Sequence, residues 1–147
     1  MKINCLEVLK EKEKFEWIPI LACGNSEETK QMQVEYNIQN GKGCKIKIEE
    51  GFSLVFIVFS ISCVISALSD GDNYAKISGL PYAATDYGSV SFGQFSFGID
   101  ITKDAPLGMF SSQSIYIKTQ RGGMDRWVAY PNDKCIIYGS GFYFTNE

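Results

Sequence analysis

The sequence predicts an all-β protein, an antiparallel β-sandwich of the jelly-roll type, and three observations support this fold class. Aromatic residues are abundant, with 10 Phe and 8 Tyr among 147 residues, and such residues are enriched in strands. The chain also contains 14 glycines, which recur between short apolar stretches as turn residues do. The third observation is a long uncharged run after Gly51, in which apolar residues repeat with a period of two.

Short stretches of alternating apolar and polar residues follow one another along the chain. Pro19 interrupts the first of them, which suits a strand at the edge of a sheet. The dipeptide Asn40-Gly41 predicts a tight hairpin, and a change of phase at Gly93 predicts a β-bulge. The predicted strands cover residues 17–21, 30–39, 44–49, 54–67, 74–78, 90–101, 114–119, 126–130, 134–138 and 142–145.

The long run has one wholly apolar face and a second face that is apolar only at its start. The first face comprises Val55, Ile57, Phe59, Ile61, Cys63, Ile65 and Ala67; the second comprises Leu54, Phe56 and Val58, then Ser60, Ser62 and Ser66. The preceding strand is expected to direct Cys44, Ile46 and Ile48 inward and Lys45, Lys47 and Glu49 outward. Because these apolar residues exceed one sandwich interior, we expect a second buried surface shared with copies of the chain.

The alternative interpretation of the run is a transmembrane helix. Residues 52–68 are uncharged, which reaches the lower end of the roughly 17–25 residues that span a bilayer. The β-branched and aromatic content argues against a helix, and the acidic flanks at Glu49, Glu50, Asp70 and Asp72 provide no basic anchor. We therefore expect no membrane insertion, and residues 1–14 lack the apolar core of a secretory signal.

Charge and residue content exclude several function classes. A net charge of −3 does not suit a nucleic-acid surface. The chain has 5 cysteines without paired spacing and no histidine, which argues against a structural zinc site and excludes Ser-His and Cys-His catalytic pairs within one chain. We expect no metal and no cofactor. Cys44, Cys63 and Cys135 each lie in an apolar strand pattern, so we interpret them as small buried hydrophobes with free thiols, which fits folding in a reducing cytosol.

The domain organisation is simple. Residues 1–14 are rich in charge and form an expected arm or linker, and residues 15–147 form one β domain.

Three sequence motifs resemble a domain at the C-terminal ends of bacteriophage tail fibres and tailspikes. They are Glu16-Trp17-Ile18-Pro19, then Tyr36-Asn37-Ile38-Gln39-Asn40-Gly41, then Ile77-Ser78-Gly79-Leu80-Pro81-Tyr82. That family reads W-x-P, Y-x-x-Q-x-G-x-Y and G-L-P-[FY] in the same order, and ends in a short aromatic strand, as residues 141–145 do here. Two departures are Cys44, where the pattern usually has an aromatic residue, and the missing upstream fibre shaft.

The resemblance implies a homotrimeric β-sandwich on a virion tail, folded in the cytoplasm of the bacterial host or encoded by a prophage. Many members bind a host cell-surface glycan or other receptor, and some only hold the trimer together. The residues that carry the motif are Trp17, Pro19, Tyr36, Gly41, Gly79, Leu80, Pro81 and Tyr82. Pro81 restricts Leu80 to an extended conformation, so the motif itself is expected to end a strand and pack into the core or the trimer axis.

Glycan recognition would need aromatic platforms beside carboxylates and amides. The best cluster in the sequence is Asp125, Arg126, Trp127, Tyr130, Asn132 and Asp133, and a second is Asp86, Tyr87 and Gln94. The alternative interpretations are a core or interface role for Trp127 and solvated turns for the acids.

We do not expect an enzyme. Asp70 with Asp72, or Asp100 with Asp104, could supply a carboxylate pair for glycan cleavage, but both pairs lie in turn-like contexts. The turn at residues 70–73 is too short to supply six calcium ligands. The open functions are therefore a receptor-binding fibre tip, a purely structural trimerisation cap, and a glycan hydrolase or lyase tip.

Overall fold

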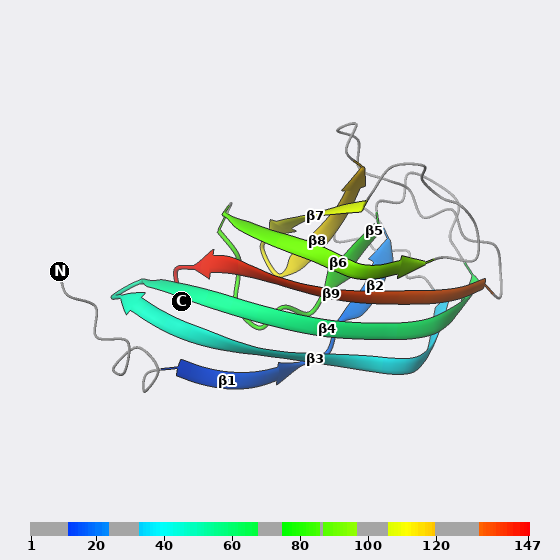
Figure 1. The fold of residues 1–147 in the computed structure, drawn as a ribbon, viewed down its shortest axis with the longest axis horizontal. Coiled ribbons are helices and arrows are strands. Elements are labelled where there is room, and N and C mark those ends of the chain that lie inside the picture. The colour runs from blue at the N-terminus through cyan, green and yellow to red at the C-terminus, as the bar shows by residue number, and fades with distance from the viewer. Residues whose placement is uncertain (1–11, 24–32, 68–74, 86, 97–105, 120–132) are drawn as a thin grey trace.

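The computed structural model describes residues 12–23, 33–67, 75–85, 87–96, 106–119 and 133–147, and within them the chain is all-β. These residues form one antiparallel sheet with the strand order β1-β3-β4-β9-β6-β7-β8-β5-β2 (Figure 1). The strands are β1 (Lys12–Trp17), β2 (Ile20–Cys23), β3 (Gln33–Glu49), β4 (Phe52–Ala67), β5 (Ala75–Ser78), β6 (Gly88–Ser96), β7 (Pro106–Ser111), β8 (Ser114–Thr119) and β9 (Asp133–Thr145).

The sheet is curled, and its two edge strands are consecutive in the chain. Ile18 and Pro19 connect β1 at one edge to β2 at the other. The amide of Leu21 on β2 donates a hydrogen bond of 2.9 Å to the hydroxyl of Tyr36 on β3, so the curl brings β2 back toward β3. The Gln39 side chain donates to the carbonyl oxygen of Pro19 at 3.0 Å, which holds the connection in place. The predicted edge position of Pro19 is confirmed, but it separates two strands where the sequence predicts one interrupted strand.

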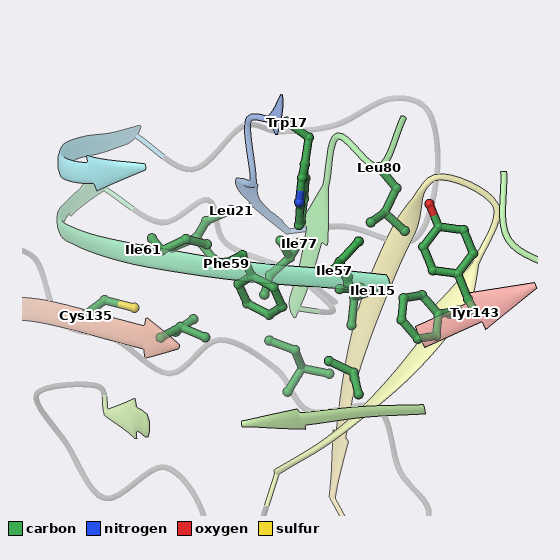
Figure 2. Close-up of a cluster of buried hydrophobic side chains, with 14 of the residues drawn as sticks. Trp17, Leu21, Ile57, Phe59, Ile61, Ile77, Leu80, Ile115, Cys135 and Tyr143 are labelled. Atoms are coloured by element: carbon green, nitrogen blue, oxygen red, sulfur yellow. The ribbon is translucent and has the colours of Figure 1, made fainter. Parts of the chain in front are cut away.

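One hydrophobic core fills the inside of the curl. The odd-numbered residues of β4 from Val55 to Ile65 are 0–3% exposed, and they pack in one cluster with Ile77 of β5 and with Ile115 and Ile117 of β8 (Figure 2). Burying an aliphatic side chain of this size stabilises the fold by about 1.5–3 kcal/mol. The predicted apolar face of the long run is therefore confirmed as the core face, and the run is a strand.

The predicted hairpin at Asn40-Gly41 is wrong. Strand β3 continues through both residues, and the chain turns instead at Gly51, whose φ of 70° lies in the left-handed region. Gly41 pairs with Trp17 on one side and with Phe59 on the other. A Cβ atom at Gly41 would lie 2.5 Å from the indole nitrogen of Trp17. The glycine serves a close contact between side chain and backbone, and the dipeptide resembles a turn signal only by coincidence.

The predicted facing of residues 44–48 is also wrong. Cys44 pairs with Phe56 and Ile46 pairs with Leu54 on the outer face of the sheet, while Lys45 pairs with Val55 on the inner face. Ile48 is 53% exposed. The inner face accommodates Lys45 because its ammonium lies 3.6 Å from a Glu13 carboxylate oxygen and 4.2 Å from the centre of the Tyr82 ring. The apolar residues of this part of β3 consequently point away from the core.

Two further expectations concern β6 and the start of the domain. The register between β6 and β9 shifts between Phe92 and Gln94, which confirms the predicted bulge at Gly93. The sheet begins at Lys12, inside the segment expected to be an arm, while residues 1–11 lie outside the described part of the chain.

Candidate functional site

The most distinctive surface is an apolar strip on the outer face of the sheet. Because directly opposed residues of an antiparallel pair point to the same side, the pairs Lys14–Cys44, Cys44–Phe56 and Phe56–Phe142 place four side chains in one row across β1, β3, β4 and β9. Neighbouring rows add more apolar residues. We call outer strip the set of Cys44, Ile46, Leu54, Phe56, Val58, Phe142 and Phe144.

The outer strip is exposed to solvent, whereas the residues on the opposite face of β4 are buried. Phe56, Val58 and Phe142 are 42%, 53% and 39% exposed, while Val55 and Ile57 between them in the chain are 0% and 1% exposed. The aromatic rings support one another, since Phe56 lies 6.5 Å from Phe142 between ring centres and Phe142 lies 6.2 Å from Phe144. An exposed apolar surface of this continuity is typical of an interaction site.

The strip contains a shallow groove with a basic rim. The groove has a volume of about 530 Å³, and Phe56, Val58 and Phe142 contribute to its apolar lining. Lys12, Lys14 and Lys42 border it. Among the described residues none of these three ammonium groups has an ion-pair partner. The arrangement can bury apolar groups and attract carboxylates, and its lining includes the half-buried thiol of Cys44 and the Ser140 hydroxyl.

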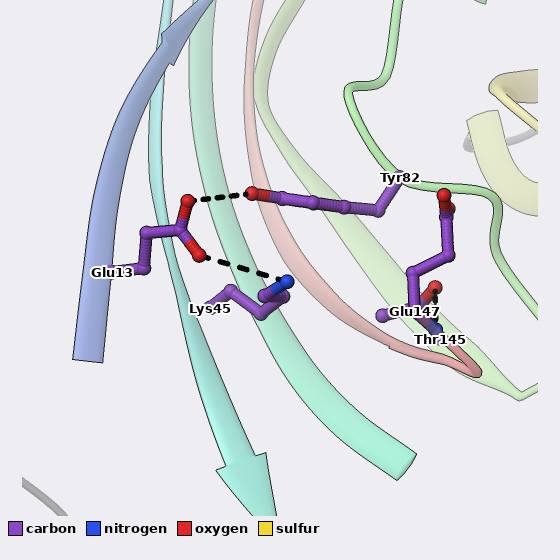
Figure 3. Close-up of polar contacts among 5 residues, drawn as sticks. All are labelled: Glu13, Lys45, Tyr82, Thr145 and Glu147. Atoms are coloured by element: carbon purple, nitrogen blue, oxygen red, sulfur yellow. Dashed lines mark hydrogen bonds and ion pairs between the residues drawn. The ribbon is translucent and has the colours of Figure 1, made fainter. Parts of the chain in front are cut away.

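A second cluster, of polar residues, lies on the inner side of the sheet near Tyr82. Figure 3 shows the Glu13 carboxylate of β1 in contact with both the Tyr82 hydroxyl, which donates a hydrogen bond at 3.2 Å, and the Lys45 ammonium. Partial burial raises the pKa of Tyr82, and the carboxylate of Glu13 raises it further. The Phe15 ring packs edge-on against the Tyr82 ring, with 5.6 Å between the ring centres. The cluster fastens the Tyr82 segment to β1 and β3.

The end of the chain joins this cluster. The Glu147 carboxylate accepts a hydrogen bond of 2.6 Å from the amide of Ala83, and the Glu147 amide donates to the Thr145 hydroxyl at 3.2 Å. A polar hollow of about 350 Å³ lies beside it, bordered by Glu13, Lys45 and Glu147 among others. On its rim, a hydrogen bond from Lys47 lowers the pKa of the Glu50 carboxyl. These contacts join the charged groups of Glu13, Lys45, Lys47, Glu50 and Glu147 to other groups of the same chain.

The motif residues predicted to be structural lie where such a role requires. Trp17 and Leu80 are 6% and 1% exposed, and Gly79 has a φ of 100°, with the Ile18 carbonyl oxygen occupying the space that a side chain would need. The Leu80 amide donates a hydrogen bond of 3.1 Å to the Gln113 carbonyl oxygen. In the segment from Gly79 to Tyr82, Leu80 therefore lies in the core cluster and Tyr82 packs against it.

The predicted glycan cluster falls almost wholly outside the described residues. Asp125, Arg126, Trp127, Tyr130 and Asn132 lie there, and Asp133 is the first residue of β9. In the second cluster, Asp86 is also outside, while Tyr87 is 72% exposed and Gln94 is exposed on β6. The carboxylate pairs at residues 70 and 72 and at residues 100 and 104 are not described either.

Sequence reasoning found three of the seven residues of the outer strip. The apolar start of the second face of the long run identified Leu54, Phe56 and Val58. It missed Phe142 and the lysines of the rim, because the pairing of β4 with β9 and of β3 with β1 depends on strand register, which no local pattern reveals.

Within the described residues, no cluster of three or more Cys, Asp or Glu side chains could hold a metal ion. No helix among these residues is long and apolar enough to span a bilayer. In comparisons with known proteins, no family model, no curated protein and no solved structure matches this chain.

Proposed function

We propose that this chain is the tip domain of a phage-like tail fibre, and that it forms a homotrimer in which the outer strip is covered by neighbouring copies. The observation that carries the proposal is the exposure of Phe56, Val58 and Phe142 beside the buried residues Val55 and Ile57 on the inner face of β4. The order of the three sequence motifs supports the family, and the packing of Trp17, Leu80 and Tyr82 agrees with the structural part assigned to them.

The size of the strip suits contact with another protein. The strip residues lie on β3, β4 and β9 and, with β1 beside them, cover four strands spaced at about 4.8 Å over about five residues at 3.3 Å each, a face on the order of 300 Å². A standard protein interface buries about 800 Å² on each partner, so the strip would form the centre of such an interface. A shallow sheet face of these dimensions matches a protein surface better than it matches a small ligand, which binds in an enclosing cleft.

Charge favours a copy of the same chain as the occupant. In a cyclic trimer each copy presents two different patches to its two neighbours. The three rim lysines, which have no ion-pair partner within the described part of the chain, then meet a patch that can carry the chain's own exposed acids, such as Glu35 and Glu49. With a net charge of −3, the chain has carboxylates to spare for such contacts.

The jelly-roll sandwich belongs to the same proposal. Strands β1, β3, β4, β9 and β6 form one arm of the curled sheet and β7, β8, β5 and β2 form the other, and both arms contribute to one core. In the assembled trimer we expect the two arms to act as the two layers of a sandwich.

In that setting the tip binds a host cell-surface glycan or other receptor through Asp125, Arg126, Trp127, Tyr130, Asn132 and Asp133. The support is the composition of this segment, which combines aromatic rings with acids and an amide. A structural trimerisation cap is the second candidate, because the outer strip accounts for assembly without a ligand.

Sedimentation tests assembly. We expect a species of three times the 16.4 kDa chain mass. Phe56→Glu should shift this species to the monomer, whereas Gln113→Glu, which adds the same charge on an exposed turn of the other arm, should not. A wild-type monomer, or a trimer that survives Phe56→Glu, would contradict the proposed interface.

Glycan arrays then separate the candidates. Binding that is lost in a trimeric Trp127→Ala variant supports the receptor-binding tip. A trimer that binds no glycan supports the cap, and depolymerisation of a host polysaccharide would point to a hydrolase or lyase tip instead.

A further inference from the structure

Two cysteines face each other on β4 and β9, which are neighbouring strands in the interior of the sheet. Cys63 of β4 and Cys135 of β9 are directly paired, and both point to the inner face, where they are 1% and 0% exposed. Directly opposed residues of antiparallel strands have Cα atoms about 4.5–5.5 Å apart. A disulfide requires Cα atoms about 4.4–6.8 Å apart, so the backbone already has the separation that a bond between these sulfurs needs.

The surroundings distinguish the two thiols. A hydrogen bond from Cys135 lowers the pKa of Cys63, and the same interaction together with burial raises the pKa of Cys135. Cys63 is therefore the better nucleophile of the pair. Cys44 cannot compete, because it pairs with Phe56 on the outer face of the sheet.

We propose that Cys63 and Cys135 form a modification site at which a small-molecule disulfide, such as glutathione disulfide, closes a bond between β4 and β9. The Cys63 thiolate attacks one sulfur of glutathione disulfide and releases one glutathione thiolate. The Cys135 thiolate then attacks the Cys63 sulfur of the mixed disulfide and releases the second. The two cysteines lose two protons and two electrons, and the oxidant becomes two molecules of reduced glutathione.

Access to the buried pair comes through the strand ends. Cys135 is the third residue of β9, and Cys63 lies four residues before Ala67, the last residue of β4. Strand ends open at lower free energy than the centre of a sheet. Reaction is consequently slow in the closed sheet and faster when these ends open.

The test uses the whole chain with Cys5→Ser, Cys23→Ser and Cys44→Ser, so that only the pair remains. Incubation with glutathione disulfide, in buffer and in urea below the unfolding midpoint, should remove both thiols together and leave a monomeric chain on a non-reducing gel. The intact mass should fall by two hydrogens, and the urea midpoint should rise, because the bond closes a long loop in the unfolded chain. Persistence of both thiols, or accumulation of a stable glutathione adduct, would overturn the proposal.

A matched variant controls for register. Replacing Cys135→Ser and Ile137→Cys moves the second thiol to the residue that pairs with Ile61, two residues out of register with Cys63 but on the same face. This variant should close at least tenfold more slowly than the native pair under the same conditions. Equal rates would show that direct pairing does not drive the reaction and would count against the site.

Discussion

The two faces of β4 have similar composition near its start but different surroundings. On the inner face, Val55 and Ile57 are covered by the other arm of the same chain, whereas on the outer face Phe56 and Val58 have no such cover among the described residues. The comparison shows that apolar alternation reports which faces avoid water but does not report what covers them. One face is explained by folding, and the other is explained by the proposed assembly.

The largest expected effect separates these two faces by mutation. Ile57→Ala should lower the free energy of unfolding by about 2–5 kcal/mol, because it leaves a cavity in the core. Phe56→Ala should cost under about 1 kcal/mol in the isolated chain, since the ring is already partly exposed, and should instead weaken the trimer. Urea unfolding at low protein concentration measures the free energy of unfolding of each variant. Sedimentation of the folded variants measures the trimer. Equal losses of stability would show that the outer face is part of the monomer core.

A second, smaller effect concerns the contact of the inner face with Trp17. Gly41→Ala should destabilise the fold by about 1–3 kcal/mol, because the new methyl group would overlap the Trp17 ring. Gly93→Ala is the control, since nothing lies within 4 Å of a Cβ atom at that position. Thermal unfolding of the two variants should differ clearly. A tolerated Gly41→Ala would argue that the ring can move aside and that the tight pairing of β1 with β3 is not required.

The smallest expected effect is on the pH dependence of stability, through the Tyr82 hydroxyl beside the Glu13 carboxylate. Because Tyr82 has a raised pKa, the folded chain holds its proton at pH values where the unfolded chain has released it, and stability falls as the pH rises above about 10. Glu13→Gln should lower the pKa of Tyr82 and reduce the loss of stability at alkaline pH. The pKa should stay above its ordinary value, because burial also raises it. An NMR titration of ring-labelled tyrosine measures the pKa of Tyr82.

Glu16→Gln is the matched control, because Glu16 occupies the same strand but points to the outer face. If both substitutions move the Tyr82 titration equally, the direct contact with Glu13 is not the cause.

Much of the fold follows from patterns within single strands. The long strand β4, its core face and the bulge at Gly93 depend on residues that are close in sequence, and all three are predicted correctly. The hairpin at Asn40-Gly41 and the facing of Cys44 are wrong, because both depend on contacts with β1, whose residues are distant in sequence. Lys45 could be placed inside only with knowledge of Glu13 and Tyr82.

The same limit applies to the candidate site. Phe56 could be identified from its own strand, but Phe142 joins the outer strip through a pairing between segments far apart in the chain. The cluster around Trp127 was selected for its chemistry alone, and its residues lie outside the described part of the structure.

The position of β9 has a consequence for how the molecule comes into being. This strand is the last in sequence, yet it lies between β4 and β6 in the interior of the sheet. Until the ribosome has synthesised β9, β4 has only β3 as a neighbour, and β6 lacks β9 as its main partner. Such distant pairings form slowly, so the nascent polypeptide exposes unpaired edges until β9 emerges, and a product truncated before β9 would be prone to aggregate.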